Sequence, residues 1–156
     1  MKKFLSVLIV FLIAINFSVV SAQSARWSNN DEANKFPQEV LRLVNLERAK
    51  VGASPLKLAK DLTRSAYIRV KELPTKFSHT RPNGSKCFTA MPQIGHILGE
   101  NLAGGQTSPQ QVVQAWMDSK THRENMLNKN FTEMGIVYYY QPNSKYKHYW
   151  VQHFRG

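Results

Sequence analysis

The sequence has little cysteine, little acid and no apolar run long enough to cross a membrane. A single cysteine among 156 residues excludes an internal disulfide, so the hydrophobic core alone must hold the fold. The apolar stretch at residues 4–15 is shorter than the roughly 20 residues that a spanning helix needs. No internal repeat or low-complexity tract is visible, which excludes a repeat architecture.

Acidic residues are half as common as basic ones. The chain has 21 lysines and arginines against 10 aspartates and glutamates, and its formal net charge is +11. An exported protein with this charge is expected to bind anionic surfaces such as cell-wall polymers or lipids. The basic residues form no cluster interleaved with aromatic residues, so nucleic acid is not an expected partner. Solvation of helix faces explains the charge equally well.

The N-terminus has the organisation of a secretory signal peptide. Lys2 and Lys3 precede the apolar run, and small residues end at Ala22, where we expect cleavage. The remaining chain of about 134 residues suits one domain, and its formal charge falls to about +9 because two lysines are removed. We therefore predict a signal peptide at 1–22, a flexible leader at 23–35 and a domain at 36–156. The mature protein is then secreted, to a periplasm or the cell exterior, without a transmembrane anchor.

Helical patterns come first along the chain. Apolar residues recur on one face from Pro37 to Ala49, and Gly52 with Pro55 ends that helix. A second helix carries an apolar stripe at four-residue steps, Leu58, Leu62, Ala66 and Val70. Two further helix starts have capping signals, Ser108-Pro109 with Gln111, and Thr121 with Glu124.

Strand patterns come last. Residues 134–140 and 147–154 are rich in aromatic and β-branched side chains and predict a hairpin. The region 75–108 is rich in loop signals and has one short strand pattern near residues 94–98. This order predicts an α+β fold with helices packed on an antiparallel sheet. Cys87 is interpreted as a buried small hydrophobe, and the alternative is an exposed thiol that cross-links two chains.

Four ordered fragments resemble a known family. They are residues 77–84 (FSHTRPNG), 99–103 (GENLA), Ala115-Trp116 through His122-Arg123, and 149–154 (YWVQHF). Together they resemble the bacterial branch of the CAP superfamily. It is also called SCP-like, and includes cysteine-rich secretory proteins, antigen 5 and plant pathogenesis-related 1 proteins. The resemblance covers residues 37–154 and implies a three-layer αβα sandwich with a central antiparallel sheet flanked by helices.

In this superfamily a cleft is lined by two histidines and usually two acidic residues. The motif match assigns His79, Glu100 and His122 to three of these positions. Ser119 stands at the fourth, where eukaryotic relatives have a glutamate three residues after the tryptophan. Asp118, next to it, would point about 100° away around the same helix. Any mechanism that needs two carboxylates is therefore not supported.

Two neutral imidazoles and a carboxylate suit Zn²⁺ or another divalent metal. His122 at the first turn of a helix meets the positive end of the helix dipole, which disfavours its protonated form and suits a ligand. A plainer interpretation has His79 bonded to loop backbone and Glu100 accepting backbone N–H groups. Asn101 is expected to tie a glycine-rich loop together, and His153 to be a half-buried sheet residue rather than a ligand.

The sequence therefore predicts an exported binding module. Its cleft would hold a divalent metal through His79 and His122, and its basic surface would recruit an anionic cell-envelope polymer or a lipid. The alternative is a metal-dependent hydrolase with Glu100 as general base, and a third hypothesis is an adhesion domain that does not use the cleft. The missing second carboxylate favours binding over catalysis.

Overall fold

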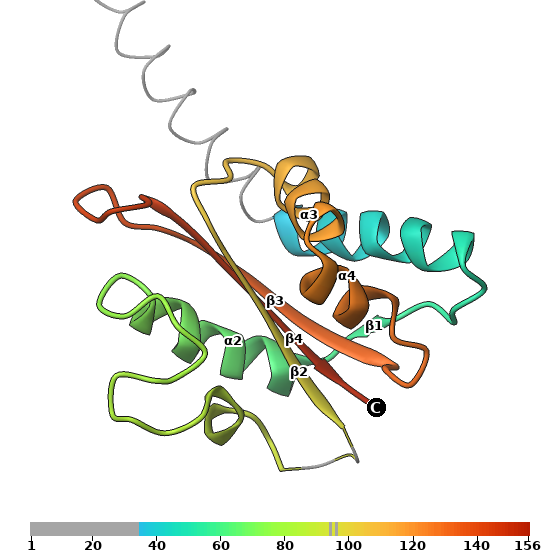
Figure 1. Ribbon diagram of the computed structural model, residues 1–156, viewed down its shortest axis with the longest axis horizontal. Coiled ribbons are helices and arrows are strands. Elements are labelled where there is room, and N and C mark those ends of the chain that lie inside the picture. Colours follow the sequence, from blue (N-terminus) through green and yellow to red (C-terminus); the bar gives the residue numbers. More distant parts are fainter. Residues whose placement is uncertain (1–34, 94, 96) are drawn as a thin grey trace, which may run out of the picture. The chain divides into compact units, whose positions relative to one another are not determined.

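The computed structural model describes residues 35–156 except 94 and 96. The predicted signal peptide and nearly all of the leader lie outside this part. Its helices are one over residues 35–50, α2 (Lys60–Glu72), η1 (a 3-10 turn, Cys87–Ala90), α3 (Pro109–Asp118) and α4 (Lys120–Leu127). Its strands are β1 (Lys57–Leu58), β2 (Leu98–Gly104), β3 (Glu133–Tyr140) and β4 (His148–Arg155) (Figure 1). None of the described helices has the length and apolar character to span a bilayer.

The four strands form one sheet in the order β1-β3-β4-β2. The three long strands are antiparallel, which confirms the predicted hairpin of β3 and β4. The short strand β1 runs parallel to β3, so the sheet as a whole is mixed. Leu58 was predicted to lie in the second helix, but it pairs with Met134 instead. The backbone N–H of Ala59 also donates to Met134, and this ladder delays the helix until Lys60.

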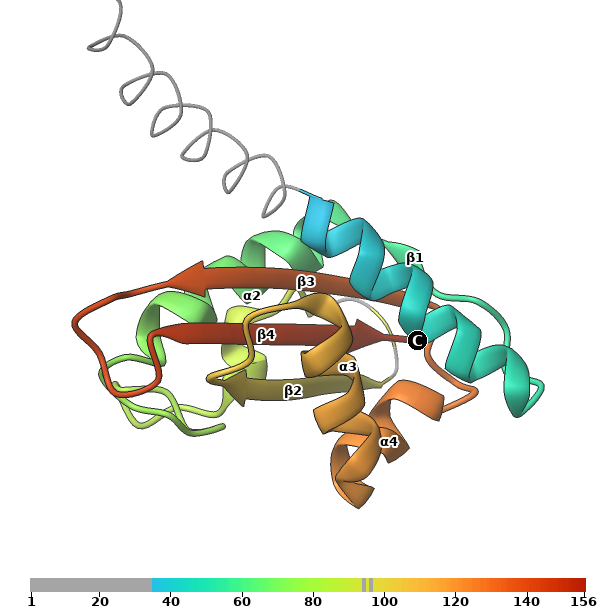
Figure 2. The same cartoon turned by 90° about the horizontal axis from the view of Figure 1, so that it is seen from above.

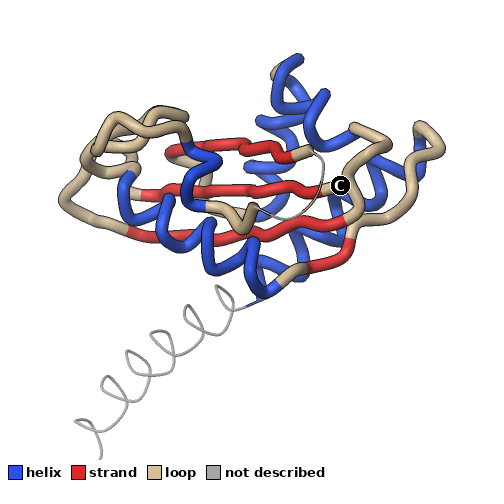
Figure 3. The backbone as a smooth tube through the Cα atoms, turned by 90° about the horizontal axis from the view of Figure 1, so that it is seen from below, coloured by secondary structure: helices blue, strands red, loops and turns tan. Residues whose placement is uncertain are grey.

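Helices cover both faces of the sheet and form the predicted three-layer αβα sandwich. The helix over residues 35–50, α3 and α4 lie on one face (Figure 2), and their apolar residues pack around Trp150 and Phe154. Helix α2 lies on the other face (Figure 3), where it packs against Leu102, Tyr149 and Val151. This contact is so close that a Cβ on Gly135 would lie 2.2 Å from a backbone carbon of α2.

Strand β2 is the edge strand beside which the site is built. The short strand expected near residues 94–98 begins only at Leu98 and continues to Gly104; residue 94 lies outside the described residues. Glu100 and Asn101 are therefore strand residues, not loop residues. Successive side chains of a strand point to opposite faces. Glu100 accordingly bonds α2, and Asn101 bonds α4.

The capping signals had different outcomes. Ser108 caps α3 as predicted, because its hydroxyl accepts from the backbone N–H of Gln111 at 3.3 Å. The predicted N-cap at Thr121 is wrong. Helix α4 begins at Lys120, and Ser119 occupies its N-cap position. Ser119 makes no capping bond with the backbone; its Oγ lies 2.7 Å from Nδ1 of His122.

Candidate functional site

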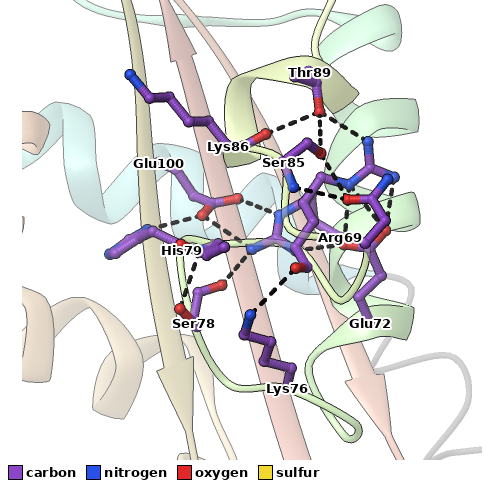
Figure 4. A network of polar contacts seen from close by, with 12 residues as sticks. Arg69, Glu72, Lys76, Ser78, His79, Ser85, Lys86, Thr89 and Glu100 are labelled. Carbon is purple, nitrogen blue, oxygen red and sulfur yellow. Dashed lines mark hydrogen bonds and ion pairs between the residues drawn. The ribbon is translucent and has the colours of Figure 1, made fainter.

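The carboxylate of Glu100 is the centre of a buried polar network on the α2 side of the sheet (Figure 4). Arg69 of α2 donates to both carboxylate oxygens, through Nε at 2.9 Å and Nη2 at 3.3 Å. His153 lies opposite Glu100 in the sheet and bonds it through Nε2 at 3.1 Å. His79 approaches from the loop after α2, with its Nδ1 at 2.8 Å from Oε1. Both carboxylate oxygens of Glu100 are therefore hydrogen-bonded to side chains of the protein.

These partners hold Glu100 in its ionised form. Burial alone raises the pKa of this carboxyl, but hydrogen bonds from His153, His79 and Arg69 outweigh burial and bring the pKa well below 4.5. A carboxylate with four donors and a lowered pKa is a poor proton acceptor near neutral pH. The geometry gives no support to Glu100 as a general base.

Glu100 instead orients the imidazole ring of His79. An ionised carboxylate can only accept, so Nδ1 of His79 must carry the proton in this hydrogen bond. When the ring is neutral, the lone pair then lies on Nε2, which is the arrangement of a metal-binding histidine supported by a carboxylate.

Arg69 positions His79 in a second way. Its Nη2 donates to the backbone oxygen of Ser78 at 2.6 Å, and its Nη1 pairs with Glu72. The Arg69 side chain is fully buried. Arg69 was not among the site residues predicted from the sequence. A signal for it exists, because Arg69 stands three residues after Ala66 and thus lies in the apolar stripe of α2. A buried cation in such a stripe requires a buried anion.

His153 is wholly buried, not half-buried as expected. Burial lowers the pKa of His153. The Glu100 carboxylate acts in the opposite direction, but the effect of burial is larger. Its Nδ1 bonds the hydroxyl of Ser65, which like Arg69 comes from the buried side of α2, at 2.7 Å. His153 thus links the sheet to α2 and supports Glu100.

On the opposite face of β2, Asn101 holds helix α4 in place. Its Nδ2 donates to the backbone oxygen of His122 at 3.1 Å, and its Oδ1 accepts from Asn125 at 2.9 Å. Asn101 is fully buried. Asn101 was predicted to tie a glycine-rich loop together; in the structure these bonds tie a helix to a strand instead.

The pKa of His122 is lowered by its surroundings. Burial lowers the pKa of His122, and positive charge on His79 lowers it further. Ser119, the residue at the predicted fourth cleft position, contacts His122 through the bond between its Oγ and Nδ1. Asp118 is exposed and accepts from Gln114, so it does not supply a second carboxylate there.

A pocket of about 330 Å³ opens along β2 beside His122. Its walls include Phe77, Tyr146 and the backbone of β2 near Gly104, with Gln106, Ser119 and His122 as polar lining. Of the predicted cleft residues, Ser119 and His122 line this pocket. His79 and Glu100 lie outside its wall.

His79 belongs to a cluster of three side chains whose atoms could bind a metal ion. The ligand atoms of His79, Cys87 and Glu100 lie within 4.8 Å of one another. Cys87 is buried, as predicted. Burial and the Glu100 charge raise the pKa of its thiol to about 12, so the thiol is protonated at neutral pH. This set differs from the predicted one, because Cys87 stands in it and His122 does not.

Comparison with known proteins supports the resemblance seen in the sequence. An uncharacterized protein of Bacillus subtilis (strain 168), YkwD, is 36% identical over 126 residues, which make up 78% of this chain and 47% of that protein. The chain thus spans about half the length of this relative.

Solved structures share the fold. One is an extracellular protein containing a SCP domain from Bacillus anthracis, with a TM-score of 0.69 and 24% identity over 80% of this chain and 41% of that one. Another is NaASP2, solved with Zn²⁺, with a TM-score of 0.57 and 16% identity over 77% of this chain and 78% of that one. A profile of the CAP family, described as the cysteine-rich secretory protein family, matches residues 41–154. The chain therefore belongs to the CAP, or cysteine-rich secretory protein, family.

Proposed function

We propose that the protein is an exported binding module that holds a divalent metal ion through the imidazoles of His79 and His122. The observation that carries this proposal is the pairing of both rings at Nδ1. Glu100 engages Nδ1 of His79, and Ser119 engages Nδ1 of His122. When each Nδ1 donates, both Nε2 atoms keep a lone pair, and imidazole nitrogen is a common ligand of zinc.

The electrostatics of His122 suit metal binding. Burial lowers the pKa of His122, which keeps this ring neutral at physiological pH, and a metal ligand must be neutral imidazole. Two imidazoles leave coordination positions for water or for a group of a bound partner. A metal there would supply a Lewis acid. The protein NaASP2, which shares the fold, has been solved with Zn²⁺.

The basic surface and the extracellular relative support a partner in the cell envelope. The formal charge of about +9 expected for the mature chain, which is +11 for the full sequence less Lys2 and Lys3, favours an anionic polymer or lipid. The predicted signal peptide, together with the extracellular SCP-domain protein that shares this fold, supports export. We do not propose the hydrolase, because Glu100 is committed to four hydrogen bonds and Ser119 supplies no second carboxylate.

The cluster of His79, Cys87 and Glu100 is a competing ligand set. A metal bound there would have to displace the proton of a buried thiol whose pKa is raised to about 12. It would also have to replace hydrogen bonds that already occupy both oxygens of Glu100. The pair of histidines needs neither change, and we therefore favour it.

A titration of the apo protein with Co²⁺ distinguishes the two ligand sets. We expect uptake of one ion without a thiolate-to-cobalt charge-transfer band. His79→Ala and His122→Ala should each lower the affinity by at least about tenfold, while His148→Ala, on the terminal hairpin, serves as the matched control.

A charge-transfer band that disappears in Cys87→Ser, with affinity retained in His122→Ala, would instead assign the metal to the cluster with Cys87. Absence of any uptake would overturn the metal proposal altogether. Far-UV circular dichroism of each variant shows that the fold is intact.

A further inference from the structure

We propose that the pocket beside His122 is a subsite for a sugar unit of an anionic polysaccharide. The inference deepens the proposed binding function, because it names the ligand class of the same cleft. It does not depend on the metal. Three features in and near the pocket support it: one side formed by two aromatic rings, an unsatisfied polar group, and lysines without acidic partners among the described residues.

Two aromatic side chains form one side of the pocket. The ring centroids of Phe77 and Tyr146 lie 4.9 Å apart, and both rings pack near Tyr149. Gly104 allows this arrangement, because a Cβ there would lie 2.9 Å from Cγ of Tyr146. Phe77 is 41% exposed although it lines the recess. Its exposed ring face can pack against the C–H groups of a sugar ring without a change in the fold.

The remainder of the pocket is polar. Gln106 lines it, and the side-chain oxygen of Gln106 is buried with no hydrogen-bond partner among the described residues. A buried acceptor without a donor is destabilising and is rare in native proteins. The oxygen is closed to solvent in this structure, so a ligand hydroxyl or amide N–H would supply the missing donor once the side chain turns toward the pocket. The hydroxyl of Ser119 and the imidazole of His122 add two further polar groups.

One lysine lies beside the aromatic side of the pocket, and a second lies over the α2 face of the sheet. Nζ of Lys145 lies 5.1 Å from the ring centroid of Tyr146, and Nζ of Lys71 lies 3.8 Å from that of Tyr139. Tyr139 and Tyr146 both pack on the same buried cluster under α2. Neither lysine pairs with an acid in the described part of the chain, and the nearby Glu72 is occupied by Arg69 and Arg81. Such unneutralised cations favour an anionic ligand.

A polysaccharide fits this combination better than a membrane does. Insertion into a lipid surface needs apolar side chains that protrude from the protein. Here the rings of Phe77 and Tyr146 form the wall of a recess. An acyl chain would offer no donor to the oxygen of Gln106, and none to the polar pair of Ser119 and His122. A sugar ring has both apolar C–H faces and hydroxyl donors, and an anionic polysaccharide also complements the lysines.

The test uses calorimetric titration of the full mature chain with a uronic-acid tetrasaccharide, in low salt and with a chelator present. We expect binding that weakens about tenfold in Phe77→Ala and in Lys145→Glu. Gln106→Met keeps the side-chain volume but removes the unsatisfied oxygen, and should also weaken binding. Lys129→Glu is the matched control, because it makes the same charge change at an exposed site before β3 and should change affinity less than about twofold.

Three comparisons can overturn the proposal. Equal loss in Lys129→Glu and Lys145→Glu would show that net charge alone drives binding. A neutral tetrasaccharide that binds as tightly as the charged one would contradict the role of the lysines. Binding to phosphatidylglycerol vesicles but not to the tetrasaccharide would make the surface a membrane site. Metal uptake measured on Phe77→Ala and Lys145→Glu should be unchanged, which separates this inference from the metal proposal.

Discussion

At the scale of single residues, the site depends on how the charge of Glu100 is balanced. Arg69 and Glu100 are both almost fully buried, and each is the other's charged partner. Removing one member of a buried pair leaves the second charge without compensation, and this costs more free energy than the intact pair contributes. The pair also places His79, through the carboxylate on one side and through Ser78 on the other.

Glu100→Gln should lower the free energy of unfolding by about 3 kcal/mol at neutral pH, because Arg69 then keeps only the less buried Glu72 as an anionic partner. The folded-state pKa of Glu100 lies below 4.5, so its stabilisation is present above that pH and is lost as the pH falls through the folded pKa. The difference between wild type and variant should therefore shrink in acid. Urea denaturation from about pH 7 to pH 3 measures it.

Glu124→Gln is the matched control, because Glu124 is exposed and forms no ion pair among the described residues. It should change stability by less than about 0.5 kcal/mol. A Glu100→Gln difference that stays constant down to the lowest pH would contradict the assignment of a lowered pKa to this carboxyl.

At the scale of elements, α3 and α4 begin with the same residue type and use it differently. Ser108 satisfies a backbone N–H of α3, whereas Ser119 at the start of α4 bonds a side chain, that of His122. A cap stabilises its helix, and a bond to an imidazole orients a ligand. If His122 binds a metal as proposed, Ser108 serves stability and Ser119 serves function.

Ser108→Ala should destabilise the protein by about 1 kcal/mol and leave metal affinity unchanged, since only the cap of α3 is lost. Ser119→Ala should have a smaller effect on stability and lower metal affinity by about 10–100-fold, because His122 loses its orienting partner. Chemical denaturation and the Co²⁺ titration measure the two effects. If both variants shift the same quantity, the distinction between the two serines is refuted.

At the scale of the whole molecule, Arg48 joins the helix over residues 35–50 to the distant segment 126–131. Its guanidinium is fully buried and donates to four backbone oxygens, which belong to Ser54, Met126, Asn128 and Phe131. These bonds connect the helix over residues 35–50 to the end of α4 and the approach to β3. Burial lowers the pKa of Arg48, and no carboxylate compensates it among the described residues.

Arg48→Met should destabilise the domain by about 3 kcal/mol or more, because it leaves several buried carbonyl oxygens without donors. Arg42→Met, which removes an exposed pair with Glu39, should change stability by less than about 0.5 kcal/mol. Thermal and urea unfolding of both variants checks this. Similar losses in the two would show that Arg48 does not join the segments.

Much of the fold could be predicted from local sequence patterns. The alternation in residues 134–154 is a local property, and β3 and β4 form the expected hairpin. Strand β2 was misplaced because its sequence, LGENLAG, has no β-branched residue. It is a strand because it pairs with β4, and pairing of this kind overrides intrinsic preference. Leu58 lies in a strand for the same reason.

The sequence by itself determined the family and, through the family, the three-layer architecture, and it predicted the order of helices and the terminal hairpin. These follow from motif order and from hydrophobic periods, which are read over short windows. Only the tertiary structure decided that Glu100 is held by Arg69 and His153, which lie 31 and 53 residues away along the chain. Such contacts depend on sheet register and helix placement, so no local pattern contains them. The same is true of the pocket, where residues from a loop, an edge strand, a hairpin and two helices meet.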